Sequence, residues 1–414
     1  MMILENKRII LGVTGSIAVY KAVDLASKLT QAGAQVDVVM TEAALRFVTP
    51  LTFQSVTGRP VYTDLWQTDH SGGLPTHIAH IGLGEGADLL VVAPATANTI
   101  AKLAHGLADD LLSVIALAAR CLLVIAPTMD GGMYEHPATQ ANLELLRERG
   151  AIIIEPDEGR FASGLIGKGR LPETLTLIGA IRQTLGSNGS LAGYKVVVTA
   201  GGTQEAIDPV RFITNRSSGK QGYALAQAAL DAGAKVTLIS TANTLSIPYG
   251  AEFVLAPSAA DLLAAVQVQL ADTDVLIMAA AVADFRPTAT AEHKIKKSDD
   301  PDEGLTLSLV RTVDILATIS HLPQRPKVVV GFAAESQDLL INAQSKLTRK
   351  KLDLIVANDI SAIDAGFQVD TNRVVIIDTE GHQERLDLMT KTQVSEHIIQ
   401  RISSLLQSSA SHPA

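Results

Sequence analysis

Small polar residues follow several apolar, β-branched segments in the first half of the chain. Thr14, Gly15 and Ser16 come directly after RIILGV, and Thr41 and Thr96 follow QVDVVM and ADLLVVAPA. A glycine permits a tight turn and a serine can cap a helix, so free backbone N–H groups after the first segment can hold a phosphate. The loop matches neither GxGxxG nor a P-loop, so it does not indicate ordinary dinucleotide or ATP binding. A capped helix without a ligand is the alternative interpretation.

Two histidines, His77 and His80, lie in THIAHIGL just before an apolar segment. No glutamate follows in the HExxH sense and no third ligand is evident, so the pair does not predict a metal site. An imidazole with a pKa of about 6.5 is suited to removing a proton at neutral pH. His80, which precedes a strand that lines the expected cleft, is therefore a candidate base.

Lysines gather at two places in the second half. The segment HKIKK contains Lys294, Lys296 and Lys297, and a later helical segment contains Lys346 and Lys350. A run of charge is usually a solvated surface. Residues four apart share one face of a helix, however, so Lys346 and Lys350 can converge on a polyphosphate. In a chain of net charge −9, this concentration of lysine indicates where an anion binds.

A long loop after KVVVTA precedes the segment SSGK and a predicted helix from about residue 219. The loop contains Gly201, Gly202, Arg211 and Asn215. Glycines let backbone amides approach phosphates, and a helix N-terminus adds a favourable dipole. SSGK resembles a Walker A motif only superficially, because Gln221 stands where Ser or Thr should bind magnesium.

Strand and helix patterns alternate along both halves. The predicted strands of the first half are RIILGV, QVDVVM, ADLLVVAPA, CLLVIAP and AIIIEP, with a helix from about Ile17. Those of the second half are KVVVTA, KVTLIS, DVLIMAAA, KVVVGFAA, LDLIVAND and RVVIID. This alternation predicts an α/β protein with two doubly wound, Rossmann-like domains and mainly parallel sheets. In such sheets ligands bind beyond the carboxyl ends of the strands.

The segment GSNGSLAG marks a domain boundary. We expect domains at 1–185 and 194–407, joined by a linker at 186–193. The halves also contain similar segments, LASKLTQAGAQVDVVMT from Leu25 and LAQAALDAGAKVTLIST from Leu225. This similarity fits either a generic connection between helix and strand or a duplication.

Composition excludes several classes of protein. The negative net charge argues against a nucleic-acid surface, and a single cysteine, Cys121, excludes an internal disulfide and fits a reducing cytoplasm. The longest apolar stretch is interrupted by Ser113 and Arg120, so we expect neither a membrane span nor a membrane partner. The first residues do not resemble a signal peptide.

Long motifs in a fixed order identify a resemblance. TGSIAVYK, HIGLGEGADLLVVAPATAN, APTMDGGMYEHPAT and ASGLIGKGR resemble flavin-dependent cysteine decarboxylases. GGTQEAIDPVRFITNRSSGKQGYALA, AAAVADF, HKIKK, GFAAE and KLDLIVAND resemble the phosphopantothenate-cysteine ligase domain. In this order the chain resembles the bifunctional enzymes of coenzyme A biosynthesis from Arg8 to about Leu406.

For the first half, the resemblance implies FMN held by Gly15, Ser16, Thr41 and Thr96. It also implies decarboxylation of 4'-phosphopantothenoylcysteine to 4'-phosphopantetheine, with His80 at the position of the essential histidine. The flavin oxidises the thiol so that the adjacent carboxylate can leave as carbon dioxide.

The first half departs from the family pattern at two candidate catalytic positions. Asp130 stands where Asn is common, and Ser163 stands where many members have a proton-donating Cys. Because a hydroxyl is a much weaker acid than a thiol, direct replacement should slow the last protonation. Water, Asp130 or a residue of a flap over the site could supply the proton instead. The alternatives are therefore a ligase with an impaired decarboxylase domain, or a non-catalytic flavin-binding regulatory protein.

For the second half, the resemblance implies ligation of cysteine to 4'-phosphopantothenate through an acyl-cytidylate. Asn215 and Arg211 match positions that handle the intermediate and substrate, and Asp284 is the candidate magnesium ligand. The family also implies homo-oligomers with trimeric flavin domains and dimeric ligase domains. The residues that match CTP-binding positions are Ala280, Asp284, Lys294, Phe332, Lys346, Lys350 and Asn358.

Overall fold

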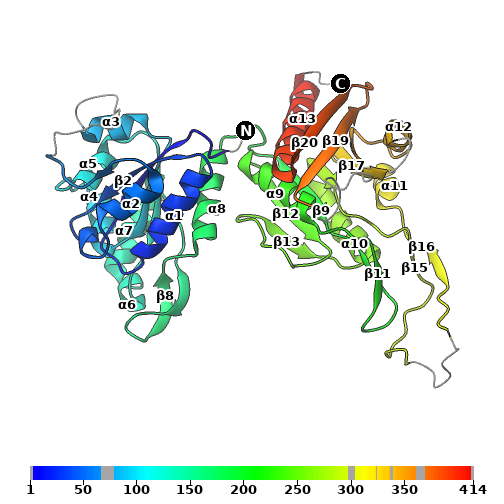
Figure 1. Cartoon of the computed structure of the whole chain (residues 1–414), viewed down its shortest axis with the longest axis horizontal. Helices are drawn as coiled ribbons and strands as arrows, with labels where there is room; N and C mark the ends of the chain where they lie inside the picture. Colours follow the sequence, from blue (N-terminus) through cyan, green and yellow to red (C-terminus); the bar gives the residue numbers. More distant parts are fainter. Residues whose placement is uncertain are drawn as a thin grey trace. The chain divides into compact units, whose positions relative to one another are not determined.

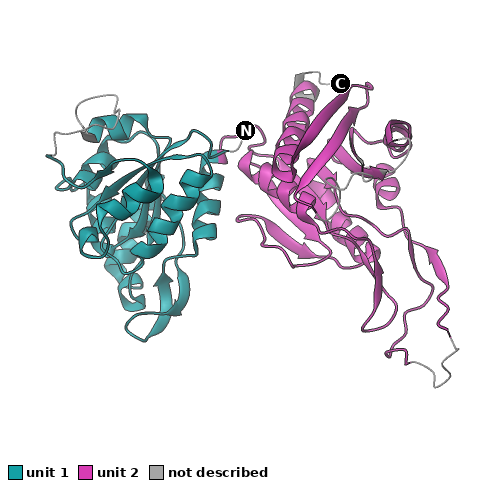
Figure 2. Ribbon diagram, viewed as in Figure 1, with its two compact units in different colours: residues 1–185 teal, residues 186–414 magenta. Residues whose placement is uncertain are grey.

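The chain folds into two units, with the boundary between Leu185 and Gly186 (Figure 2). The structure is a computed structural model that describes residues 3–66, 79–296, 304–322, 324–335, 339–359 and 369–411. Each unit has its own sheet and its own buried clusters of apolar side chains. Within the described residues, no helix is both long and apolar enough to cross a membrane.

Unit 1 is built around a six-stranded sheet of order β3-β2-β1-β4-β5-β6, in which every pair is parallel (Figure 1). Two further strands, β7 and β8, form a separate antiparallel hairpin. The elements from the N-terminus to the boundary are β1 (Arg8–Val13), α1 (Val19–Gln31), β2 (Gln35–Met40), η1 (Ala44–Arg46), α2 (Pro50–Thr57), β3 (Val61–Tyr62), α3 (Ala79–Gly86), β4 (Leu89–Ala95), α4 (Ala97–His105), α5 (Leu111–Ala118), β5 (Leu122–Pro127), α6 (Gly131–Tyr134), α7 (Pro137–Glu148), β6 (Ile152–Ile153), β7 (Asp157–Arg160), β8 (Ile166–Arg170) and α8 (Thr174–Gly186).

Helices cover both faces of this sheet because successive strand residues point to opposite sides. Ile9 and Leu11 pack in one cluster with α1, α2 and α8, whereas Ile10 packs in another with α3, α4, α5 and α7. The predicted doubly wound arrangement is therefore confirmed. Two details differ from expectation: α1 begins at Val19 and not near Ile17, and AIIIEP contributes only the two residues of β6.

Unit 2 repeats the scheme with an eight-stranded sheet of order β13-β12-β9-β14-β17-β18-β19-β20. The first six strands are parallel, and β19 and β20 add antiparallel pairs at one edge. Its elements are β9 (Lys195–Ala200), β10 (Gln204–Ala206), β11 (Phe212–Thr214), α9 (Lys220–Asp231), β12 (Lys235–Ser240), β13 (Glu252–Leu255), α10 (Ala259–Gln269), η2 (Leu270–Asp272), β14 (Val275–Met278), β15 (Phe285–Pro287), β16 (Leu309–Arg311), α11 (Ile315–Ser320), β17 (Val328–Glu335), α12 (Leu339–Arg349), β18 (Leu354–Asp359), β19 (Thr371–Asp378), β20 (Gln383–Thr390) and α13 (Lys391–Ser411).

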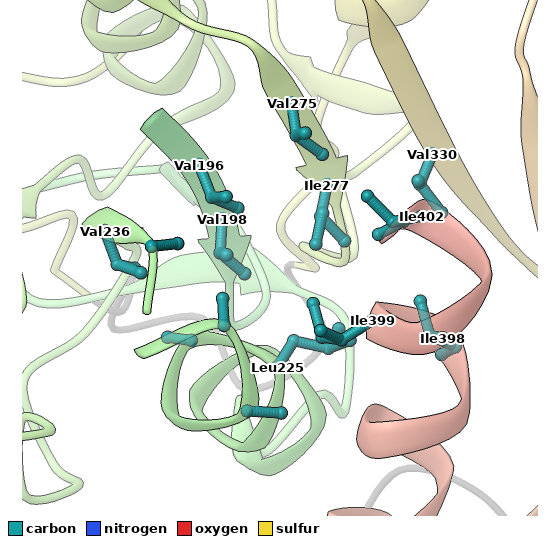
Figure 3. Packing of buried hydrophobic residues seen from close by; sticks show 14 of the residues in the cluster. Val196, Val198, Leu225, Val236, Val275, Ile277, Val330, Ile398, Ile399 and Ile402 are labelled. Carbon is teal, nitrogen blue, oxygen red and sulfur yellow. The ribbon is translucent and has the colours of Figure 1, made fainter. Parts of the chain in front are cut away.

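Helices α9 and α13 cover one face of the second sheet, and α10, α11 and α12 cover the other. Figure 3 shows the first of these layers, where Val196, Val198 and Ile277 of the strands lie against Leu225 of α9 and Ile402 of α13. The alternate strand residue Val197 packs in the opposite layer. The second half is therefore also doubly wound.

The segment 186–193 packs against unit 2. The Leu191 side chain is fully buried, and its backbone N–H donates to the Ala232 carbonyl at 2.8 Å. A Cβ added at Gly186 would lie 2.4 Å from the Asp231 carbonyl oxygen, and one at Gly189 equally close to that of Ala232. Small residues are needed here because the chain passes directly over the end of α9.

A buried carboxylate joins β1, β2 and the end of α2 in unit 1. The Asp37 side chain is fully buried and pairs with Arg8 Nε at 2.9 Å and with Arg59 Nη2 at 2.8 Å. Arg8 also donates to the Gly82 carbonyl, which ties α3 to the same group. Because two guanidinium groups depend on the one carboxylate of Asp37, we expect its two ion pairs to hold β1, β2 and the end of α2 together.

Replacing Asp37 with alanine should leave both guanidinium groups without their anion and destabilise the sheet by about 3 kcal/mol. Hydrogen exchange of β1 and β2 peptides in the full chain should then lose about a hundredfold of its protection. The control is Glu144→Ala, which removes an exposed partner of Arg147 and should change protection by less than about threefold. Equal effects of the two substitutions would contradict a structural role for Asp37.

Candidate functional site

The loops that follow β1, β2 and β4 are tied together at the carboxyl edge of the first sheet. The Thr14 hydroxyl donates to the Pro94 carbonyl at 2.7 Å and accepts from the Thr96 N–H at 3.0 Å. The Thr41 N–H donates to the Val13 carbonyl at 3.0 Å. Three predicted positions, those of Ser16, Thr41 and Thr96, are thus brought to one edge, beside the point where the strand order reverses.

Gly15 is required where two of these loops meet. A Cβ at this position would lie 2.6 Å from the Ala43 Cβ and 3.0 Å from the Ala43 carbonyl carbon. The next residue, Ser16, accepts the Ala18 N–H through its hydroxyl at 3.3 Å, so it organises the turn before α1. Backbone N–H groups and partly exposed hydroxyls at this edge are suitable donors for a phosphate monoester.

His80 lies in the first turn of α3, ahead of β4, and its side chain is partly buried. Asp88, the residue just before β4, accepts Lys7 Nζ and the Arg8 N–H, each at 2.8 Å. These two contacts tie the entry into β4 to the start of β1. His77, the other member of the HxxH pair, lies outside the described residues.

Asp130 and Ser163 are in direct contact. The Ser163 hydroxyl donates to the Asp130 carboxylate at 2.9 Å. Asp130 precedes α6, and Ser163 lies in the tip of the β7–β8 hairpin, so tertiary structure brings these two predicted residues together.

Unit 2 contains a cavity of about 920 Å³ at the carboxyl ends of its parallel strands. The loops after β9 and β14 and the last residues of β17 and β18 line it. Seven of the predicted residues meet there: Asn215, Ala280, Asp284, Phe332, Lys346, Lys350 and Asn358. Asp284 lies in the loop between β14, which stops at Met278, and β15, which begins at Phe285.

Cationic side chains enter the cavity from α12 and from the start of α9 and α13. Lys346 and Lys350 both line it, and Lys350 also pairs with Asp314 at 3.1 Å. Helix α12 ends at Arg349, yet the Lys350 N–H still donates to the Lys346 carbonyl, so the predicted spacing on one face is retained. On the other side, burial and the nearby Lys220 ammonium lower the pKa of Lys391, which is 6% exposed.

Lys391 and Asn372 were not among the predicted residues, although both line the cavity. They reach it because β19 runs antiparallel to β18 and β20 runs antiparallel to β19. The start of β19 and the end of β20 therefore lie at the edge where the parallel strands end. The sequence did contain a signal for Lys391: in QERLDLMT, leucines alternate with polar residues, which is typical of a strand, and Lys391 comes directly after it.

Asn358 presents an unused acceptor to the cavity. Its side chain is 8% exposed, and its Oδ1 has no hydrogen-bond partner within the described part of the chain. A buried acceptor without a partner costs free energy, so a ligand that donates a hydrogen bond here gains more than it would at a solvated group.

Asn215 holds two loops of the cavity against each other. Its Nδ2 donates to the carbonyls of Ala281 and Val282, each at 3.2 Å. The approach is close, because a Cβ at Gly202 would lie 2.8 Å from the Asn215 carbonyl oxygen. Gly201, with φ of +88°, lies directly beneath Thr241 and is also restricted to glycine.

Arg211 and Lys294 are not among the residues that line the cavity. Arg211 belongs to a clasp that it forms with Asp208 and the backbone of Ile295. Asp208, which is 2% exposed, accepts Arg211 Nε at 3.0 Å, Arg211 Nη2 at 2.5 Å and the Ile295 N–H at 3.2 Å. Arg211 also donates to the Ile295 carbonyl at 2.9 Å. The clasp fixes the backbone next to Lys294. Lys296 is exposed, and Lys297 lies outside the described residues.

Comparison with known proteins gives full-length matches. The family model described as "DNA/pantothenate metabolism flavoprotein C-terminal domain" matches residues 191–406, and the model described as "Flavoprotein" matches residues 3–186. The Coenzyme A biosynthesis bifunctional protein CoaBC of Bacillus subtilis (strain 168) is 49% identical over 405 residues, which are 97% of this chain and 98% of that protein. The protein of the same name from Vibrio vulnificus (strain CMCP6) is 42% identical over 406 residues, 98% of this chain and 100% of that protein.

Among solved structures, the C-terminal domain of a Coenzyme A biosynthesis bifunctional protein CoaBC is 37% identical in sequence, with a TM-score of 0.46. It covers 53% of this chain and 99% of that chain.

The clasp should persist well into acid solution. The Arg211 guanidinium, with help from backbone N–H groups, holds the pKa of Asp208 well below its usual range. A carboxyl with a depressed pKa contributes stability at every pH above its unfolded pKa of about 3.9. That stability is lost only as the pH falls through the lower pKa of the folded protein. Hydrogen-exchange protection at Ile295, corrected for the intrinsic rate, should therefore stay constant from pH 7 to pH 4.

Asp208→Asn should lower that protection about tenfold already at pH 7, because hydrogen bonds to a charged acceptor are lost. The control is Asp272→Asn, which removes an exposed partner of Lys195. Protection that falls between pH 6 and pH 4 in the unaltered chain would contradict the assigned ion pair.

Proposed function

The chain belongs to the Coenzyme A biosynthesis bifunctional proteins named CoaBC, and from this premise we propose that it catalyses two consecutive steps of coenzyme A biosynthesis. Unit 2 joins cysteine to 4'-phosphopantothenate with CTP, and unit 1 decarboxylates the product to 4'-phosphopantetheine. The observation that best supports the assignment is the cavity of unit 2, in which seven predicted residues converge.

In the ligase step, a carboxylate oxygen of 4'-phosphopantothenate attacks the α-phosphorus of CTP and pyrophosphate leaves. The cysteine amine then attacks the carbonyl carbon of the acyl-cytidylate and releases CMP. Negative charge builds on the phosphorus oxygens and on the leaving group, so cations must face them. We assign this role to Lys346 and Lys350, which line the cavity, and to Lys294, which precedes the Ile295 that the Asp208 clasp holds.

The remaining residues of the cavity orient the reactants. Asp284 is the proposed ligand of magnesium, whose other ligands would be phosphate oxygens and water, as is usual for this ion. Ala280, Phe332 and Asn358 are assigned to the nucleotide, and the free Asn358 Oδ1 suits a donor such as the amino group of cytosine. Asn215 is assigned to the acyl-cytidylate. Arg211 is assigned to the substrate, and its ion pair with Asp208 fixes its direction.

The edge of unit 1 fits the phosphate of FMN. Gly15 leaves room where a Cβ would collide with Ala43, and Ser16, Thr41 and Thr96 offer hydroxyls around it. FMN held there would supply an acceptor for two electrons from the substrate thiol and would make them available again after loss of carbon dioxide. His80 is assigned the removal of a proton from the substrate, a task suited to imidazole at neutral pH. Asp130 and Ser163 are assigned to the carboxylate end of the substrate.

We further propose that the protein works in the cytoplasm on small molecules and as a homo-oligomer, with trimeric flavin units and dimeric ligase units. Large apolar side chains on the surface of unit 1 support the assembly of flavin units. Among them are Ile17, Tyr20 and Leu51, each more than 60% exposed. Such exposure is typical of interaction surfaces when the side chains are contiguous.

A second candidate function rests on Ser163, which stands where many family members have a cysteine. In this alternative the ligase is active and the decarboxylase is impaired, so phosphopantothenoylcysteine accumulates. A purely regulatory flavoprotein is disfavoured, because such a protein has no need for the cation-lined cavity of unit 2.

Mass spectrometry of products distinguishes these functions. The full chain with FMN, mixed with 4'-phosphopantothenate, cysteine, CTP and magnesium, should yield 4'-phosphopantetheine, CMP and pyrophosphate. Accumulation of phosphopantothenoylcysteine would support the impaired decarboxylase. No product with CTP would reject the ligase assignment.

Lys346→Ala and Lys350→Ala should each raise the KM for CTP by about 10- to 100-fold, since each removes a charged contact to phosphate. The matched control is Lys235→Ala, which removes an exposed lysine of β12 and should leave the KM unchanged. Steady-state kinetics at fixed magnesium measure the effect. If either variant lowered only the affinity for cysteine, its assignment to the triphosphate would be wrong.

A further inference from the structure

Asp130 and Ser163, the two positions where unit 1 departs from the family pattern, are joined by a hydrogen bond of 2.9 Å. We propose that they act as a pair: the Asp130 carboxyl supplies, through the Ser163 hydroxyl, the proton that replaces the departing carboxylate of the substrate. Ser163 is the catalytic residue, and Asp130 acts through it. The proposal rests on the decarboxylation assigned above and identifies the acid that completes it.

The contact is set by the fold, although 33 positions separate the two residues. The Met129 N–H donates to the Gly169 carbonyl at 3.0 Å, which joins the hairpin to the segment before α6. A Cβ at Gly169 would lie 2.3 Å from the Met129 carbonyl oxygen, and one at Gly131 would lie 3.2 Å from the Phe161 ring. With no side chain between them, the hairpin tip is held against Asp130.

The orientation of the bond determines which group can give a proton. Asp130 Oδ1 accepts the Gly132 N–H at 3.3 Å, and Oδ2 accepts the Ser163 hydroxyl. When Asp130 is ionised, the hydroxyl proton of Ser163 points to the carboxylate and not to the substrate. A serine hydroxyl without such a partner is a very weak acid. When the carboxyl is protonated, it donates to Ser163 Oγ while the Ser163 hydroxyl proton passes to carbon. The net result is transfer of one proton from Asp130.

The substrate itself supplies the condition for this transfer. A carboxylate bound beside Asp130 places two like charges together, and such pairs share a proton. Loss of carbon dioxide removes one of the two charges, so the proton is no longer held and passes through Ser163. Over one turnover a carbon–carboxylate bond breaks, a carbon–hydrogen bond forms and one proton is consumed. Electrons removed from the substrate return to it, so the balance is redox-neutral.

Four variants of the full chain test the pair. Asp130→Asn keeps the acceptor for Gly132 but has no transferable proton, and Ser163→Ala removes the relay. Each should lower the rate of 4'-phosphopantetheine formation about 100-fold, a typical contribution of a general acid. The double variant D130N/S163C introduces a thiol, a sufficient acid by itself, and should return to within about tenfold of the unaltered chain. Asp157→Asn, on the same hairpin, is the control.

Two further readouts separate proton donation from mere support of the hairpin. The acid is a carboxyl in the unaltered chain and a thiol in D130N/S163C, so the pH above which product formation falls should be higher in the double variant than in the unaltered chain. On the protein as purified, without substrate, hydrogen exchange of 157–170 should quicken about fivefold in Ser163→Ala and remain unchanged in Asp130→Asn, whose amide still bonds the hydroxyl.

The proposal is overturned if Asp130→Asn or Ser163→Ala retains half of the activity, if the double variant stays inactive, or if its pH profile does not move. It is also overturned if Ser163→Ala leaves exchange of the hairpin unchanged. Failure of the proposed function gives a different result, because the unaltered chain itself would then form no 4'-phosphopantetheine from phosphopantothenoylcysteine.

Discussion

The reversal of strand order beside one central strand governs both units. From β1 the chain moves to β2 and β3 on one side and then crosses to β4 on the other; from β9 it does the same with β12, β13 and β14. Because crossover connections are right-handed, the helices that follow the two neighbouring strands cover opposite faces of the sheet. Their loops diverge at the carboxyl edge, and a crevice forms between them. The residues that line the cavity of unit 2 lie at such an edge, as do Gly15, Ser16, Thr41 and Thr96 of unit 1.

The crevices require loops to approach one another more closely than side chains allow. Gly15 against Ala43 and Gly202 against Asn215 are two points where this constraint applies, and Gly201 against Thr241 is a still closer approach. Polar contacts complete the connection: Thr14 bridges β1 and β4, and Asn215 bridges the loops after β9 and β14. The small and hydroxyl-bearing residues therefore have two consequences, since they hold the edge together and leave N–H and O–H donors facing the ligand.

Charge is distributed unevenly in a chain that is acidic overall. Lys346 and Lys350 reach the cavity of unit 2 from one face of the sheet, and Lys220 and Lys391 reach it from the other. Burial and mutual repulsion make the second pair a costly arrangement for the free protein, as the lowered pKa of Lys391 reflects. Lys220 already pairs with Asp370 at 2.6 Å, and an anionic ligand in the cavity would further relieve the repulsion between the two lysines.

Sequence periodicity alone determined the fold class and the edge at which each site forms. Alternating β-branched strands and amphipathic helices report burial locally. In the two similar segments, Gly33 and Gly233 follow a helix with the same φ of +89°. Tertiary structure alone decided which loops touch. It brought Lys391 and Asn372 into the cavity through two antiparallel strands, and it placed Ser163 against Asp130. These contacts depend on strand order and on packing between distant segments, and no local pattern of residues encodes either.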